Sequence, residues 1–200
     1  MTEQTLHWPE RVRNLPMTLD RFRAASVFFD VKYPSFLAGH LDAQKWISWG
    51  SLSAVASIPE VFEREIHVLG FATKWRSSPE RDAMRNDQFL ATLKELRNYE
   101  THLTFLTRRR TSDLPREKIL SHMDYRSFFF GPISFAQLSE LRNISEGRSP
   151  VTPAAVNEFN RLAETHTVEA IIDLGLDRLS EIIARFLSSI GYAVPVTPFT

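Results

Sequence analysis

The sequence has 200 residues, 43% of them hydrophobic, which is enough for one domain with a buried core but short for two. It contains no cysteine, so disulfide bonds, thiolate zinc sites and cysteine nucleophiles are excluded. Its 24 lysine and arginine residues balance its 24 aspartate and glutamate residues, so any binding of nucleic acid requires a local basic patch rather than overall charge.

The first predicted element is an extended arm over residues 1–18, which contains Pro9 and Pro16. A helix is then predicted from the region of Asp20, which can serve as an N-cap, to Tyr33, because Pro34 follows it.

Two more helices are predicted before residue 71. One covers residues 34–57 and is bent or interrupted near Gly50. The other covers residues 57–70, because Ser57 can cap it, Pro59 suits its first turn and Gly70 suits the position after its last turn.

The longest helix is predicted over residues 79–109, with Ser78 and Pro79 as its start signal. Apolar residues recur along it at steps typical of one buried helical face. These residues are Phe89, Leu93, Leu96, Leu103 and Leu106.

The chain changes character over residues 111–150, where loops, a hairpin with its strands within about 120–138, and a short helix are predicted. Two helices follow, one starting at Thr152 and Pro153 and one closed by Gly191, before an extended tail over residues 194–200. The predicted fold is all-α, an antiparallel bundle of five to six helices in a single domain over residues 19–193, with the irregular or hairpin insertion at 111–150.

Three polar residues, Arg97, Asn98 and His102, fall on the side of helix 79–109 opposite the apolar stripe, with Asn98 and His102 one turn apart. Leu90 and Phe105 lie on this side too, although apolar residues do not belong on a solvated face. A second surface is therefore predicted to cover this side, either another helix of the same chain or a partner subunit.

Arginine together with histidine suits phosphodiester chemistry. Histidine titrates near neutral pH and can move protons to or from a 2′-hydroxyl or a leaving oxygen. Arginine offers a planar fork for phosphate oxygens, and asparagine can orient the histidine or the phosphate. Such a site requires neither a metal nor a cofactor.

The segment "RNYETH" at residues 97–102 matches the R-x4–6-H signature of HEPN domains, so the helical region 19–110 resembles that family. The resemblance implies a helical bundle, often homodimeric, in which two copies of the motif line a shared cleft. Many such domains are metal-independent ribonucleases of toxin–antitoxin, defence or RNA-processing systems, and others are non-catalytic interaction modules. By this resemblance His102 is the catalytic acid or base, Arg97 the phosphate ligand and Asn98 the orienting residue, and an antitoxin-type protein is a candidate partner.

The basic residues beside the motif allow two interpretations. In a ribonuclease, Lys94 and the cluster Arg108, Arg109 and Arg110 would contact the RNA backbone. Alternatively, the three arginines only complement the dipole at the C-terminal end of the helix.

The motif itself also has competing interpretations. Arg161 to His166 and Arg116 to His122 fit the same spacing, although neither arginine is followed by Asn, Asp or His. The polar trio can therefore be a catalytic site, the surface of a non-catalytic homodimer or an ordinary polar face.

Other sites and locations are disfavoured by the sequence. The spacings Glu-x-x-His and His-Glu-x-x-His of helical metal sites are absent, so no metal site is predicted. The N-terminus is polar and no run of about 18 apolar residues occurs, so a cytoplasmic protein without a membrane partner is predicted.

Overall fold

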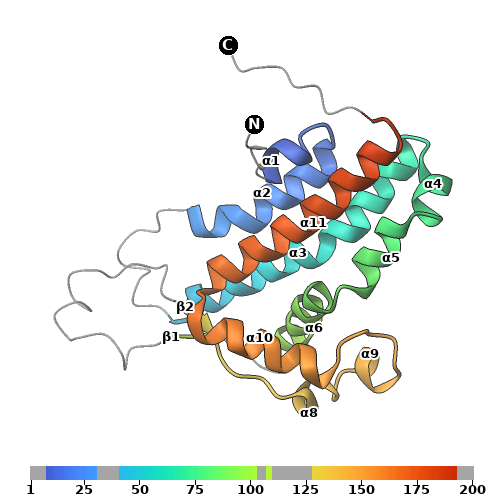
Figure 1. Ribbon diagram of the computed structural model, residues 1–200. Helices are drawn as coiled ribbons and strands as arrows, with labels where there is room; N and C mark the ends of the chain where they lie inside the picture. Colours follow the sequence, from blue (N-terminus) through green and yellow to red (C-terminus); the bar gives the residue numbers. More distant parts are fainter. Residues whose placement is uncertain (1–7, 31–40, 103–106, 110–127, 193–200) are drawn as a thin grey trace, which may run out of the picture.

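The computed structural model describes residues 8–30, 41–102, 107–109 and 128–192 (Figure 1). These residues form ten helices and two short strands, so the fold is all-α, as the spacing of apolar residues predicts. In chain order the elements are α1 (Trp8–Arg11), α2 (Pro16–Asp30), α3 (Leu41–Val68), α4 (Ala72–Arg76), α5 (Pro79–Asn86), α6 (Gln88–His102), β1 (Thr107–Arg109), β2 (Phe128–Phe130), α8 (Phe135–Leu138), α9 (Arg142–Ser145), α10 (Pro153–Thr165) and α11 (Val168–Ser189).

The core lies between α2, α3 and α11, which run side by side in Figure 1. Each contributes a fully buried phenylalanine, Phe22, Phe62 and Phe186 respectively. Burial of these large side chains is the main favourable term that holds the three helices together. Within the described part of the chain, no helix is long and apolar enough to cross a membrane.

An aromatic cluster closes the end of the core next to α4. The ring of Trp75 lies 4.9 Å from that of Phe62 and 4.9 Å from that of Phe186, both edge to face. This geometry is the preferred one for aromatic pairs. It explains why the tryptophan is almost completely buried although α4 is only five residues long.

The prediction of an extended arm over residues 1–18 is wrong for the described part, since α1 begins at Trp8 and α2 begins at Pro16. Proline suits the first turn of a helix because it has no N–H to satisfy. The two following N–H groups, of Met17 and Thr18, donate to the Glu65 side chain on α3 over 3.0 and 2.8 Å. Glu65 therefore caps α2 from another helix.

The two helices predicted over residues 34–57 and 57–70 are a single helix in the described part, α3, with Pro59 in its interior. A proline there removes one backbone hydrogen bond. Val55, Ile58 and Phe62 are buried on either side of it, so packing against neighbouring helices holds α3 together across the proline. Gly70 adopts a φ of 80° just after the helix, as expected for a residue that ends one.

The helix predicted over residues 79–109 is divided at Asp87 into α5 and α6. Ser78 caps α5 as predicted, with its side chain accepting a hydrogen bond from the Arg81 N–H. Asp87 has an extended backbone, and its Oδ1 accepts a hydrogen bond from the Leu90 N–H over 2.9 Å. An aspartate in this position starts a new helix, which explains the break.

Residues 107–109 are a strand rather than the end of a helix, and they pair antiparallel with residues 128–130. Phe130 is buried, with its ring 5.6 Å from that of Phe159 on α10. A strand buried in this way needs a partner for its backbone groups, and β1 supplies one. The second strand lies within the predicted range of 120–138, but its partner lies before that range, so the predicted pairing is wrong.

The remaining part of the predicted insertion contains the short helices α8 and α9. Thr152 caps α10 and Gly191 follows α11 with a φ of 69°, as predicted. A helix end near Tyr33 and a tail over residues 194–200 lie outside the described residues.

Helix α11 fixes the position of α6 through a close contact at Gly175. A Cβ atom added to this buried glycine would lie 2.7 Å from the Leu93 Cδ1 atom of α6. The Leu93 side chain therefore occupies the space that a side chain at position 175 would take. The helix that carries the candidate motif is thus held against the core.

Candidate functional site

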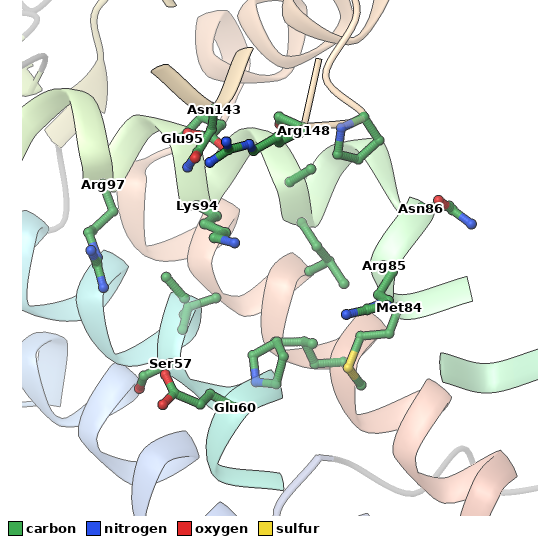
Figure 2. Close-up of a pocket in the computed structure, with 18 of the residues that line it drawn as sticks. Ser57, Glu60, Met84, Arg85, Asn86, Lys94, Glu95, Arg97, Asn143 and Arg148 are labelled. Atoms are coloured by element: carbon green, nitrogen blue, oxygen red, sulfur yellow. The ribbon is translucent and has the colours of Figure 1, made fainter. Parts of the chain in front are cut away.

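A groove with a volume of about 830 Å³ lies beside α6 and contains the N-terminal part of the motif (Figure 2). Its walls come from α3, from α5 and α6, and from the segment at residues 143–150. The charged residues that line it are the basic Arg81, Arg85, Lys94, Arg97 and Arg148 and the acidic Glu60, Glu63 and Glu95. Five cations against three anions make it locally positive in a chain whose net charge is zero.

Arg97 is held at this groove by a short chain of hydrogen bonds. Its Nη1 donates to Asn98 Oδ1 over 3.0 Å, and Asn98 Nδ2 donates to Glu95 Oε2 over 3.0 Å. Glu95 is only 2% exposed, so the series of hydrogen bonds ends at a side chain that is fixed inside the protein. Asn98 therefore orients the arginine, a role that sequence reasoning did not assign to it.

Glu95 was missed at the sequence level, although a signal for it exists. It precedes Asn98 by three residues, and residues three apart are neighbours on a helix surface. The basic lining residues Arg81, Arg85 and Arg148 were also missed. The first two come from the segment predicted as part of the motif helix, but Arg148 follows α9 and reaches the groove only through the fold.

His102 is the last residue of α6, and its side chain lies outside the described part of the structure. The helical backbone places it four residues, about one turn, after Asn98. Its role in catalysis stays a prediction.

Leu90 does not require a partner subunit for its burial. It is 9% exposed and packs in the core of its own chain, where it also lines the groove. Burial within the chain therefore accounts for Leu90, and a contact of Leu90 with a partner subunit stays a prediction. Phe105, the other residue predicted at a dimer interface, lies outside the described residues.

The predicted RNA-binding residues divide into two groups. Lys94 is exposed and lines the groove together with Arg97, three residues further along the same helix. The backbones of Arg108 and Arg109 belong to β1, so these residues do not complement a helix end. Their side chains and the whole of Arg110 lie outside the described residues.

Arg161 and His166, the residues of the competing motif match, both make contacts with residues of α10. Arg161 forms two hydrogen bonds with Glu158, of 3.0 Å from Nε and 2.7 Å from Nη2. These bonds and the attraction between the two charges hold the pKa of Glu158 below and that of Arg161 above its ordinary value. His166 Nδ1 lies 3.1 Å from the Leu162 carbonyl oxygen at the end of α10. The match at Arg116 and His122 lies outside the described residues.

Within the described ranges no group of three His, Asp or Glu side chains is arranged to hold a metal ion. In comparisons with known proteins, no family model, no curated protein and no solved structure matches the chain. The function is therefore inferred from the groove and the residues that line it.

Replacing Asn98 with alanine is expected to lower the free energy of unfolding by about 1–3 kcal/mol, because the buried Glu95 carboxylate loses a donor. Urea denaturation measures the effect. Asn157→Ala is the matched control, since Asn157 is exposed on α10 and its loss should change the free energy by less than about 0.5 kcal/mol. If the two variants had equal free energies of unfolding, the hydrogen bond between Asn98 and Glu95 would contribute nothing to the stability of the fold.

Proposed function

We propose that the protein is a HEPN-like, metal-independent ribonuclease that cleaves single-stranded RNA in the groove along α6. The observation that carries the proposal is the position of Arg97, fixed by Asn98 at a groove with an excess of cations. A fixed guanidinium can bind two phosphate oxygens and stabilise the charge that builds on them during cleavage. Because the guanidinium is already positioned, little reorganisation is needed when RNA binds.

In the proposed reaction the 2′-hydroxyl oxygen attacks the adjacent phosphorus and the bond from phosphorus to the 5′-oxygen breaks. One group accepts the proton of the 2′-hydroxyl and another donates a proton to the leaving 5′-oxygen. The products carry a 2′,3′-cyclic phosphate and a 5′-hydroxyl. His102 suits either proton transfer because imidazole titrates near neutral pH.

The need for two proton-transfer groups supports assembly as a homodimer. Each chain supplies one His102, so two copies facing a shared cleft would provide both an acceptor and a donor. An antitoxin-type protein that blocks this cleft belongs to the same proposal, through the resemblance to HEPN domains. A non-catalytic homodimer is the alternative, and it predicts assembly without RNA cleavage.

Arg97→Ala tests the proposal. Cleavage of a fluorescently labelled single-stranded RNA in the presence of EDTA is expected to fall by about 10²–10³, the usual effect of removing one group that stabilises a developing negative charge. Arg161→Ala is the matched control, because Arg161 is exposed on α10 and pairs with Glu158 away from the groove. Circular dichroism checks that both variants are folded. Equal cleavage by Arg97→Ala and the control would remove Arg97 from the site.

A further inference from the structure

We infer that the groove holds a single RNA strand lengthwise, with its phosphates along the wall formed by α5 and α6 and its bases toward α3. This inference rests on the proposed function and adds the form of the substrate. The groove then recognises several consecutive nucleotides, not one isolated phosphate.

The first line of support is the set of cations that remain available to a ligand. Lys94 and Arg85 are exposed, and neither has an ion-pair partner among the described residues. Two other lining cations are engaged: Arg81 lies 3.9 Å from a Glu63 carboxylate oxygen, and Arg148 lies 2.7 Å from one of Glu146. The available positive charge is therefore concentrated on α5 and α6.

The second line of support is the order of the cations on α5 and α6. Arg97, Lys94 and Arg85 follow one another across Figure 2 along α6 and α5. Arg97 and Lys94 are three residues apart, which is about 4.5 Å along the helix axis. This is of the order of the rise per phosphate in a stacked strand, about 3.4 Å. Long side chains can accommodate the difference, so Arg97 and Lys94 can contact neighbouring phosphates, and Arg85 of α5 can contact a phosphate further along the strand.

The third line of support is the opposite charge of the facing wall. Glu60 and Glu63 of α3 are exposed and line the groove. Glu60 lies 2.7 Å from Arg64 and Glu63 lies 3.9 Å from Arg81, each through one carboxylate oxygen, so the second oxygen of each can still accept a hydrogen bond. Without an available cation among the described residues that line it, this wall is less favourable for phosphates than the wall of α5 and α6, which leaves it for the bases. A carboxylate accepts hydrogen bonds from the exocyclic amino group of cytosine. We therefore expect the α3 wall to favour cytosine over uracil, which carries a carbonyl oxygen at the corresponding position.

The track of phosphates is tested with a 2′-O-methyl oligonucleotide of about ten nucleotides. This probe lacks the attacking hydroxyl, so binding is measured without cleavage and without altering His102. For single strands, each phosphate contact contributes about 0.7 to the slope of log affinity against log salt concentration. Lys94→Gln and Arg85→Gln should each reduce that slope by about 0.7, and the double variant by about 1.4.

Arg161→Gln is the matched control for the salt dependence and should leave the slope unchanged, because Arg161 lies outside the groove and is paired with Glu158. Unchanged slopes for Lys94→Gln and Arg85→Gln, or no binding of the probe by the wild type, would overturn the phosphate track. If both variants reduce the slope but the wild type does not cleave unmodified RNA, the phosphate contacts are supported and the ribonuclease activity is refuted. The experiment therefore distinguishes failure of the phosphate track from failure of the proposed function.

The orientation of the bases is tested with oligocytidine and oligouridine probes of equal length. Oligocytidine should bind on the order of tenfold more tightly, as expected for good hydrogen bonds to a base edge. Glu60→Gln should reduce this preference and raise the affinity for oligouridine, because a negative charge facing the strand is removed. Equal affinities for both probes in the wild type would overturn the assignment of the bases to the α3 wall.

Discussion

Replacement of His102 with alanine is expected to lower the rate of single-stranded RNA cleavage by about 10²–10⁴, the usual contribution of a positioned general acid or base. His102 ends α6 about one turn after Asn98, on the helix whose Arg97 lines the groove. Without the imidazole, proton transfer has to be performed by water or by a group that is not positioned for it. Single-turnover kinetics with labelled RNA measure the loss.

His166→Ala is the matched control for His102→Ala. Its Nδ1 atom lies near the Leu162 carbonyl oxygen and the Thr165 hydroxyl at the end of α10, so its removal should leave the cleavage rate unchanged. Wild-type activity of His102→Ala would rule out the catalytic assignment. Unfolding of that variant, detected by circular dichroism, would instead assign the histidine a structural role.

Glu65→Ala is expected to lower the free energy of unfolding by about 3–5 kcal/mol. The buried carboxylate accepts hydrogen bonds from the backbone N–H groups of Met17 and Thr18, and from the Thr18 hydroxyl over 2.6 Å. Hydrogen bonds to a charged group contribute about 1.5–3 kcal/mol each and are not fully additive. The negative charge also lies at the positive end of the α2 dipole. Its removal leaves the first turn of α2 without a cap.

Two variants separate this cap from general effects of the substitution. Glu65→Gln keeps one acceptor oxygen and should lose less stability than Glu65→Ala. Glu60→Ala removes a glutamate of the same helix that is exposed and pairs with Arg64 over 2.7 Å, so it should change the free energy by less than about 1 kcal/mol. Urea denaturation of all three variants would contradict the capping role if Glu65→Ala were as stable as Glu60→Ala.

Sequence reasoning identified the elements whose signals are local. The caps at Ser78 and Thr152 and the glycine positions after α3 and α11 depend on a few neighbouring residues, and the structure confirms them. The helical fold class also follows from local spacing, because a buried helical face repeats every three to four residues.

The errors arose where distant residues decide the local structure. The sequence predicts Pro59 at the start of a helix, but α3 continues through it because Val55, Ile58 and Phe62 are packed in the core. Pro16 is a local signal for the start of α2, but the cap of this helix comes from Glu65, 47 residues from Thr18. Such contacts cannot be obtained from propensities near the helix end.

The break at Asp87 is a different kind of error, because its signal was present in the sequence. Aspartate is a strong N-cap residue. The start signal at Ser78 and Pro79, followed by the regular apolar spacing after Asp87, favours one long helix over two. The division matters for the site, since it gives Arg85 of α5 a direction different from that of a continuous helix and places it on the groove.

The candidate site was predictable only in part. Arg97 and Lys94 share a face of one helix, so their common location followed from spacing. The α3 wall, with Glu60 and Glu63, and the Arg148 segment join them only through the tertiary fold. Sequence spacing could therefore suggest the chemistry of the motif but not the shape or the charge of the groove around it.

Metal-independent RNA cleavage at the α6 site determines the chemical ends of the products, so these ends are the measurement of choice. Purified protein is incubated with single-stranded RNA in EDTA, and the products are examined by mass spectrometry. We expect 2′,3′-cyclic phosphate and 5′-hydroxyl ends from the wild type, with product formation strongly reduced in Arg97→Ala and His102→Ala. No cleavage in EDTA, or equal cleavage by wild type and both variants, would contradict metal-independent cleavage at this site.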